Sequence, residues 1–387
     1  MRYLTAGESH GPAITTIIEG LPANLPLDQL EINQDLTRRQ QGYGRGGRMK
    51  IEKDQVEILA GLRFGKTLGS PLTLQVINKD YAQWSDKMAP FGEQPPEIAL
   101  VTHPRPGHAD LPGALKYNLA DIRNVLERAS ARETVARVAV GAVARSLLRA
   151  FDIQIYSYVE AIGQVSAAAQ KVAALVAANY AGVENSPVRC PDPTAAQQMT
   201  KAIDEAKAAG DSLGGIFVVA ALGVPVGLGS HVQWDRKLDA RLAAALMSIQ
   251  AIKGVEIGEG FSLAAQPGSE AHDEIYYHHS KGYYRQTNHA GGIEGGMSNG
   301  EAIVCRVAMK PIPTLSKPLQ SVNMQDHRPY TAAVERADSC AVPAAAIVGE
   351  AVMAWELAQA LREKLGSDSL EEMQDNYRTY LKTIAKR

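Results

Sequence analysis

The stretch AAAIVGEAVMAWELAQALREKL, residues 344–365, predicts a long helix. Alanine is abundant in this segment and in the other expected helices, whereas aromatic residues make up only 6% of the chain. Helices with small side chains on their surfaces can pack closely against their neighbours, because protein interiors are dense. We therefore expect layers of alanine-faced helices rather than an aromatic core.

Two more segments predict helices that belong to these layers. Residues 238–252 are rich in alanine and leucine, and they are too apolar for a surface helix, so we expect a buried one. Residues 127–134 open another long helix, which is expected to run to about residue 151. Ser130 and Glu133 have the spacing of a capping box, with Ser at the N-cap and Glu at the third helical position, in which the two side chains satisfy free backbone donors.

Strands are expected where β-branched and apolar residues run or alternate between turn residues. These segments are residues 1–6, 13–19, 56–64, 71–78, 215–224 and 302–309. Glycine and proline loops are spread evenly along the chain rather than gathered at one boundary. We therefore expect residues 1–387 to form a single domain, with a helical and peripheral tail from about residue 366.

Composition limits the function classes. The 387 residues carry a formal net charge of −2, so there is no overall basic field that would recruit nucleic acid. The three cysteines lie far apart, which argues against a disulfide framework or a zinc module. His272, His278 and His279 lack the spacing of metal ligands, so no metal is expected. No signal peptide or membrane span is indicated, and a soluble cytoplasmic protein is expected.

Residues 38–48, RRQQGYGRGGR, combine four arginines and four glycines without any acid. Such a segment predicts a loop, and arginine is well suited to binding carboxylate or phosphate through two hydrogen bonds. We interpret the loop as a binding site for a small polyanion. A solvated flexible loop and an RNA-contacting segment are the alternatives. It is not a dinucleotide fingerprint, because a helix, residues 28–40, precedes it rather than a strand.

Other loops carry polar side chains that suit catalysis or anion binding. His10 and Ser9 lie in the bend GESHGP, residues 7–12, and His108 lies in the rigid loop THPRPGHAD, residues 102–110. Arg128 and Arg132 flank a helix N-terminus, where the dipole disfavours cations and an anionic ligand would resolve the conflict. Residues 291–300 contain five glycines, which would let the backbone approach a flat or phosphorylated ligand. For each loop, a purely structural turn is the alternative.

Taken together, six motifs in chain order resemble those of the chorismate synthase family. They are GESHG at 7–11, RPGHAD at 105–110, SARET at 130–134, MSIQAIKGVE at 247–256, NHAGG at 288–292 and RADSC at 336–340. The resemblance covers roughly residues 1 to 345. Ala129 and Ala337 depart from the family pattern, which leaves the side-chain roles at these two positions open.

The resemblance implies an α/β (α+β) fold, a β-α-β sandwich with central helices between antiparallel sheets, assembled as a homotetramer. It also implies a carbon–oxygen lyase at the last step of the shikimate pathway to aromatic amino acids. The substrate would be 5-enolpyruvylshikimate 3-phosphate, and a trans-1,4 elimination of phosphate would yield chorismate. Reduced FMN would be required without net redox change. Whether the enzyme reduces its own flavin with NADPH is open; the missing dinucleotide fingerprint favours an external reductant.

The same resemblance assigns roles to residues of this chain. His108 would act on the phosphate side and His10 on the flavin side, while Asp338 would orient Ser9 or relay a proton. The substrate-binding arginines would be Arg39, Arg45, Arg48, Arg105 and Arg132. The FMN-binding residues would be Arg128, Ala129, Ser130, Gln250, Ala251, Gly295, Lys310, Pro311, Ile312, Pro313, Thr314 and Arg336.

Two other functions remain open at this point. One is a flavoenzyme that oxidises or reduces an anionic substrate. The other is a protein that binds polyanions or RNA through the arginine loop, although the low net charge and the scarcity of aromatic residues there argue against it.

Overall fold

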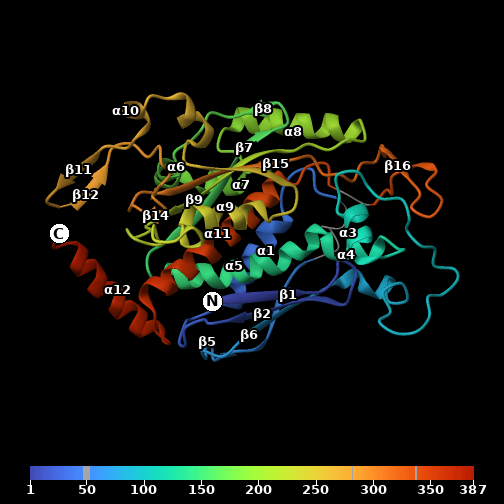
Figure 1. Ribbon diagram of the computed structural model, residues 1–387, viewed down its shortest axis with the longest axis horizontal. Helices are drawn as coiled ribbons and strands as arrows, with labels where there is room; N and C mark the ends of the chain where they lie inside the picture. The colour runs from blue at the N-terminus through green and yellow to red at the C-terminus, as the bar shows by residue number, and fades with distance from the viewer. Residues whose placement is uncertain (47–52, 281, 336–337) are drawn as a thin grey trace.

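Two antiparallel sheets enclose a layer of helices in the computed structural model, which describes residues 1–46, 53–280, 282–335 and 338–387 (Figure 1). The first sheet has the strand order β1-β2-β6-β3. Its strands are β1 (Arg2–Ala6), β2 (Ala13–Glu19), β6 (Leu72–Ile77) and β3 (Val56–Ala60). Along β2 the residues alternate in burial, so that Ile14, Thr16 and Ile18 face the helices.

The second sheet has the order β10-β15-β9-β7-β8, and every neighbouring pair is antiparallel. Its strands are β10 (Ile252–Ile257), β15 (Ile303–Met309), β9 (Gly215–Leu222), β7 (Gln154–Ile162) and β8 (Val165–Ser166). Strands β7 and β9 are buried along most of their length, because helices cover them.

Helix α11 (Val342–Leu365) lies at the centre of the helical layer. It packs on α5 (Thr134–Arg149) and on strands β7 and β9, whereas α5 packs on α1 (Gln29–Gln40) and on β2 and β6 of the first sheet. The predicted sandwich of central helices between antiparallel sheets is therefore confirmed. By length and composition alone α11 could cross a membrane, but 89% of its most apolar window is buried within the protein.

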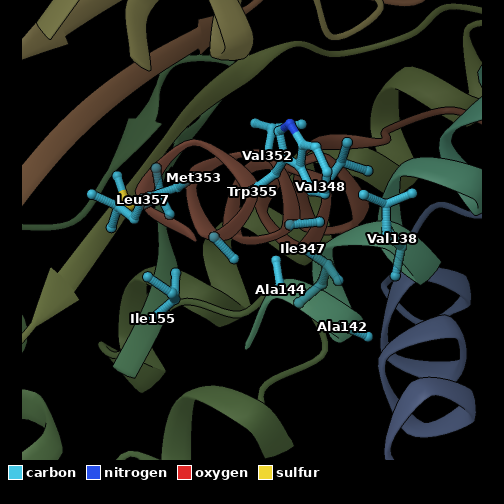
Figure 2. Packing of buried hydrophobic residues seen from close by; sticks show 14 of the residues in the cluster. Val138, Ala142, Ala144, Ile155, Ile347, Val348, Val352, Met353, Trp355 and Leu357 are labelled. Atoms are coloured by element: carbon cyan, nitrogen blue, oxygen red, sulfur yellow. The ribbon is translucent and has the colours of Figure 1, made fainter. Parts of the chain in front are cut away.

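Small side chains let α5 and α11 approach closely, as the composition predicts. Gly141 of α5 faces Ala351 of α11 so tightly that a Cβ atom on the glycine would overlap Ala351. Val138 and Ala144 of α5 lie against Ile347 and its neighbours in α11 (Figure 2). The core is thus made of alanine-faced and aliphatic layers.

The predicted buried helix at residues 238–252 is wrong in two respects. Helix α9 ends at Met247, and it buries only one ridge, formed by Leu238, Leu242 and Leu246. Arg241 pairs with Glu356 and Glu363 on the polar side, which makes the helix amphipathic. After it the chain turns through Ala251, whose φ is +67°, and enters β10.

Short elements complete the fold. Around the first sheet and α5 these are β4 (Leu62–Arg63), β5 (Lys66–Thr67), η1 (Lys79–Gln83), α3 (Asp110–Tyr117), α4 (Arg123–Ala129) and η2 (Ala131–Glu133). The remaining ones are α6 (Val172–Asn179), α7 (Ala181–Asn185), α8 (Pro193–Ala208), η3 (Trp234–Arg236), η4 (Gly260–Ala265), α10 (Gly268–Ala271), β11 (Ile275–His278), β12 (Gly282–Arg285), β13 (Ile293–Glu294), β14 (Met297–Ser298), β16 (Gln320–Val322), β17 (Pro329–Thr331) and α12 (Leu370–Ile384).

Candidate active site

A cavity of about 650 Å³ collects residues from loops that are far apart in the chain. Its volume lies within the range of small-molecule pockets, roughly 300–1,000 Å³. The sequence-predicted residues that line it are Ser9, His10, Arg39, Arg45, Arg105, His108, Ala129, Ser130, Arg132, Gln250, Ala251, Lys310, Ile312, Pro313, Thr314 and Asp338. Most of the predicted catalytic, substrate and cofactor residues therefore share one cavity.

Five predicted residues are not placed in this lining. Arg48 and Arg336 lie outside the described residues. Arg128 donates to the carbonyl oxygens of Thr5 and Gly7, so it ties α4 to the first sheet. Gly295 lies in the turn between β13 and β14, and Pro311 adjoins the cavity-lining Lys310. The roles assigned to these residues stay predictions.

Two buried arginines of the cavity wall, Arg39 and Arg132, share the carboxylate of Asp54. Arg39 Nη2 lies 2.6 Å from Asp54 Oδ2, and Arg132 Nη1 lies 2.7 Å from Asp54 Oδ1. Burial, together with the nearby charges of Arg132 and Arg45, lowers the pKa of Arg39 to about 10, although Asp54 opposes this effect. In the described part of the chain, Nε of Arg39 is buried without a hydrogen-bond partner. The wall thus carries an excess of positive charge that an anionic ligand would stabilise.

Arg45 reaches the cavity from the loop that follows α1. Its Nη1 lies 2.7 Å from Asp338 Oδ2, and the backbone N–H of Gly46 donates to Asp338 Oδ1 at 2.6 Å. Ser9 Oγ accepts a hydrogen bond from Ser130 Oγ at 3.2 Å. Both oxygens of Asp338 therefore bind the arginine loop, at Arg45 and at Gly46. The expected role of Asp338 in orienting Ser9 stays a prediction.

His108 is held by the buried carboxylate of Asp110, the first residue of α3. Its Nδ1 lies 2.5 Å from Asp110 Oδ1, and Arg105 Nε donates to Asp110 Oδ2 at 2.8 Å. Burial raises the pKa of Asp110, but hydrogen bonds from His108 and Arg105 outweigh it and hold that pKa well below its usual range. An ionised carboxylate can only accept, so Nδ1 of His108 carries a proton and Nε2 is the nitrogen left for a ligand.

His10 has a similar arrangement with a different carboxylate. Its Nδ1 lies 2.8 Å from Glu127 Oε1, and its ring stacks on Trp84 with the centroids 4.0 Å apart. Both histidines that line the cavity within the described residues therefore have Nδ1 paired with a buried acid.

The donors and acceptors around residues 250–251 and 310–314 fit a phosphorylated heterocycle such as FMN. Gln250 Oε1 is buried and finds no donor among the residues that the structure describes, so it can accept from a ring N–H. Lys310 Nζ donates to the carbonyl oxygen of Gly107, and Thr314 Oγ1 accepts from Arg105, so this segment is fixed against the His108 loop. Lys310 also brings a positive charge that suits a phosphate.

Several residues that shape the cavity were missed by sequence reasoning. Trp84 and Glu335 also line it, and Asp54 and Glu127 bind residues of its lining. Asp110, which binds His108, is the one supporting residue that the local sequence could have indicated, because it lies two positions after that histidine. No group of three or more His, Cys, Asp or Glu side chains that could hold a metal occurs among the described residues.

Comparisons with known proteins find relatives that cover all or almost all of the chain. The profile of the chorismate synthase family matches residues 1–361. The chorismate synthase of Pelobacter propionicus is 60% identical over 391 residues, covering 99% of each chain. That of Desulforamulus reducens is 60% identical over 373 residues, covering 96% of each chain. A crystal structure of a chorismate synthase superimposes with a TM-score of 0.80 at 46% identity, covering 100% of this chain and 98% of the other.

Proposed function

The chain belongs to the chorismate synthase family, and we propose that it eliminates phosphate from 5-enolpyruvylshikimate 3-phosphate to form chorismate, with reduced FMN as its cofactor. The observation that carries this proposal is the convergence of Arg39, Arg45, Arg105 and Arg132 with two acid-paired histidines in one cavity. The substrate has two carboxylates and a phosphate, so a site for it must supply several positive charges.

The arginines would bind and orient the substrate. Arg39 and Arg132 both pair with the Asp54 carboxylate, and both line the cavity, so two guanidinium groups lie where an anionic ligand would bind. Arg105 lies beside His108, with Nη2 3.1 Å from the ring Nδ1, so a phosphate that contacts His108 Nε2 would lie close to this guanidinium. Placement by several charged hydrogen bonds would fix the leaving group relative to the ring.

His108 would serve as the general acid for the departing phosphate. When both ring nitrogens are protonated, Nδ1 donates to Asp110 and Nε2 can donate to the phosphate oxygen. The buried Asp110 orients the ring through Nδ1, and Arg105 contacts the other oxygen of that carboxylate. Neutralising the phosphate in this way lowers the barrier to its departure.

Reduced FMN, when bound, would supply electron density to the reacting ring and accept the proton that leaves it. Gln250, Ala251, Lys310 and Thr314 are the residues of the cavity that would hold this cofactor. His10 would act at the same side through Nε2. We also propose a lyase that works as a cytoplasmic homotetramer with an external flavin reductant.

An anaerobic assay with chemically reduced FMN tests the proposal. Phosphate release and chorismate absorbance should rise together while the flavin stays reduced. Net oxidation of the flavin in step with substrate consumption would instead identify an oxidoreductase, and phosphate release without chorismate would identify a hydrolase.

A further inference from the structure

A single residue of α4, Glu127, holds the Ser9–His10 turn by three hydrogen bonds. Its carbonyl oxygen accepts from the Ser9 N–H at 3.0 Å, and its Oε2 accepts from the His10 N–H at 2.8 Å. The third contact joins Oε1 to Nδ1 of the His10 ring at 2.8 Å. The Glu127 side chain is only 1% exposed, so its hydrogen bonds to the turn lie inside the protein.

The face of the His10 ring is fixed as well. Trp84 stacks on it with an angle of 24° between the ring planes. Arg123 lies 5.0 Å from the centroid of the Trp84 ring, and its Nη1 lies 3.2 Å from Glu127 Oε1. The ring is therefore held at its edge by the carboxylate and on its face by the indole, and it has little freedom to rotate.

The hydrogen-bond pattern selects one tautomer of His10. Burial raises the pKa of Glu127, but hydrogen bonds from the His10 ring and backbone lower it below the ordinary value. An ionised carboxylate accepts at both oxygens, and the His10 backbone N–H already occupies Oε2. The ring must therefore donate from Nδ1 to Oε1. In the neutral ring, the lone pair is then on Nε2, which makes no hydrogen bond within the described residues.

A cation also contacts the Glu127 carboxylate. Arg123 contacts both Glu127 and Glu335, with Nη2 3.3 Å from Glu335 Oε1. The Glu127 carboxylate thus pairs with Arg123, a partner that it shares with Glu335. Its effect on His10 is directional, through the placement of one proton.

We propose that Glu127 is a positioning residue that locks His10 in the Nδ1–H tautomer, so that Nε2 presents its lone pair to the ligand in the cavity. The inference rests on the proposed function, because it takes His10 as a group that exchanges a proton with that ligand. Glu127 itself contacts His10, Ser9 and Arg123 and acts through His10.

The variant Glu127→Gln tests the lock, because an amide offers one acceptor and one donor in place of two acceptors. The His10 backbone N–H, which lies closer to Glu127 (2.8 Å) than Arg123 Nη1 does (3.2 Å), would keep the amide oxygen. The amide NH₂ would then face Nδ1, and Arg123 would lose its hydrogen bond to this position. Nδ1 must accept, so the ring proton moves to Nε2 and the lone pair that faced the ligand is lost. Glu127→Asp keeps two acceptors and should retain the wild-type tautomer.

Nitrogen-15 NMR of the histidine rings measures the tautomer directly, with the His10 signals assigned from a His10→Asn variant. We expect the Nδ1–H form in the wild type and in Glu127→Asp, and the Nε2–H form in Glu127→Gln. In the reduced-FMN assay, kcat of Glu127→Gln should fall by about 10²-fold or more, as when a catalytic histidine is held in the wrong tautomer. KM should stay within about threefold, since the tautomer bears on the chemical step rather than on the arginines.

The matched control is Glu205→Gln, which removes an exposed carboxylate paired with Lys201 and should change neither the spectrum nor kcat. The proposal is overturned if the Nδ1–H form persists in Glu127→Gln, or if the tautomer changes while kcat does not. Should Glu127→Gln fail to fold, an Nε2–H ring in Glu127→Asp would overturn it equally. Absence of phosphate release by the wild type would contradict the proposed function, whereas the tautomer spectra would still decide the role of Glu127.

Discussion

Asp110 Oδ1 lies 2.5 Å from His108 Nδ1, which gives this histidine the same type of acid partner that Glu127 provides for His10. The two pairs come from different parts of the chain, one between the His108 loop and the first turn of α3 and one between the Ser9–His10 turn and α4. Each leaves Nε2 as the ring nitrogen available to a ligand. The cavity therefore holds two oriented imidazoles beside a group of arginines.

Replacing His108 with alanine should lower kcat by about 10²–10⁴, the usual contribution of a general acid. The arginines remain in place, so KM should change much less. Phosphate release under anaerobic conditions with reduced FMN is the measurement. His231→Ala, at an exposed position outside the cavity lining, is the control. Turnover close to wild type in His108→Ala would remove His108 from the mechanism.

Replacing Asp54 with asparagine should destabilise the protein, because Arg39 and Arg132 lose the carboxylate they share. Breaking a buried ion pair by removing one partner costs about 3–5 kcal/mol. Inorganic phosphate should restore more stability to this variant than to the wild type, since an anion can replace the missing charge. Urea unfolding in phosphate and in chloride at equal ionic strength measures both effects.

The exposed Asp375, paired with Arg378, provides the control variant Asp375→Asn. Equal stability of Asp54→Asn and wild type would show that the two guanidinium groups do not depend on this carboxylate. Equal phosphate stabilisation of the two proteins would show that they do not form an anion site.

The secondary structure was largely predictable because its signals are local. Asp28 caps α1 by accepting from the Leu30 N–H. Ser130 caps the turn ahead of α5, although its side chain accepts from the Arg132 N–H rather than from the Glu133 N–H that a capping box predicts. The reciprocal half of the capping box was wrong. The Glu133 carboxylate instead binds Arg137 one turn later in α5, where a full charge is available to pair with it.

The cavity was predictable only in part, because its supporting residues depend on tertiary pairing. The motif histidines and arginines stand out in the sequence by their loop settings. Asp54 gives no local sign that it joins Arg39 to Arg132, which lies 78 positions further along the chain. Trp84 lies directly after η1, in a segment without a sequence motif, and only the folded chain shows that its ring stacks on His10. Helix α9 was misjudged because alanine does not distinguish a buried face from an exposed one.

Stability towards acid should depend on Glu350, a fully buried carboxylate of α11 that contacts Arg38, Arg145 and Arg189. Burial raises its pKa, but the three arginines outweigh this and lower it to about 2 from an ordinary 4.5. The ionised Glu350 therefore adds about 3 kcal/mol to the free energy of unfolding. This contribution is complete above pH 4.5, the ordinary pKa of a glutamate, and is lost as the pH falls towards 2.

Urea unfolding of wild type and Glu350→Gln at several pH values checks this dependence. At pH 7 the variant should be less stable by about 3–5 kcal/mol, because the buried Arg189 and the partly exposed Arg38 and Arg145 lose a shared, fully buried partner. The difference should shrink below about pH 4 as the wild-type carboxylate becomes protonated. A difference that stays constant down to acid pH would contradict the assignment.

The contact between α5 and α11 should tolerate no added volume at Gly141. A Cβ atom at this position would overlap Cα and Cβ of Ala351, and both helices lie in the core, where neither can move freely. Gly141→Ala should therefore destabilise the protein by about 1–3 kcal/mol, as overpacking usually does.

Gly182→Ala is the matched control, because this helical glycine of α7 has no atom within 4 Å of an added Cβ. It should be neutral or more stable by up to about 1 kcal/mol, since alanine favours helix. Thermal and urea unfolding of the two variants separate the effects, and a Gly141→Ala protein as stable as Gly182→Ala would show that the helices can move apart without cost.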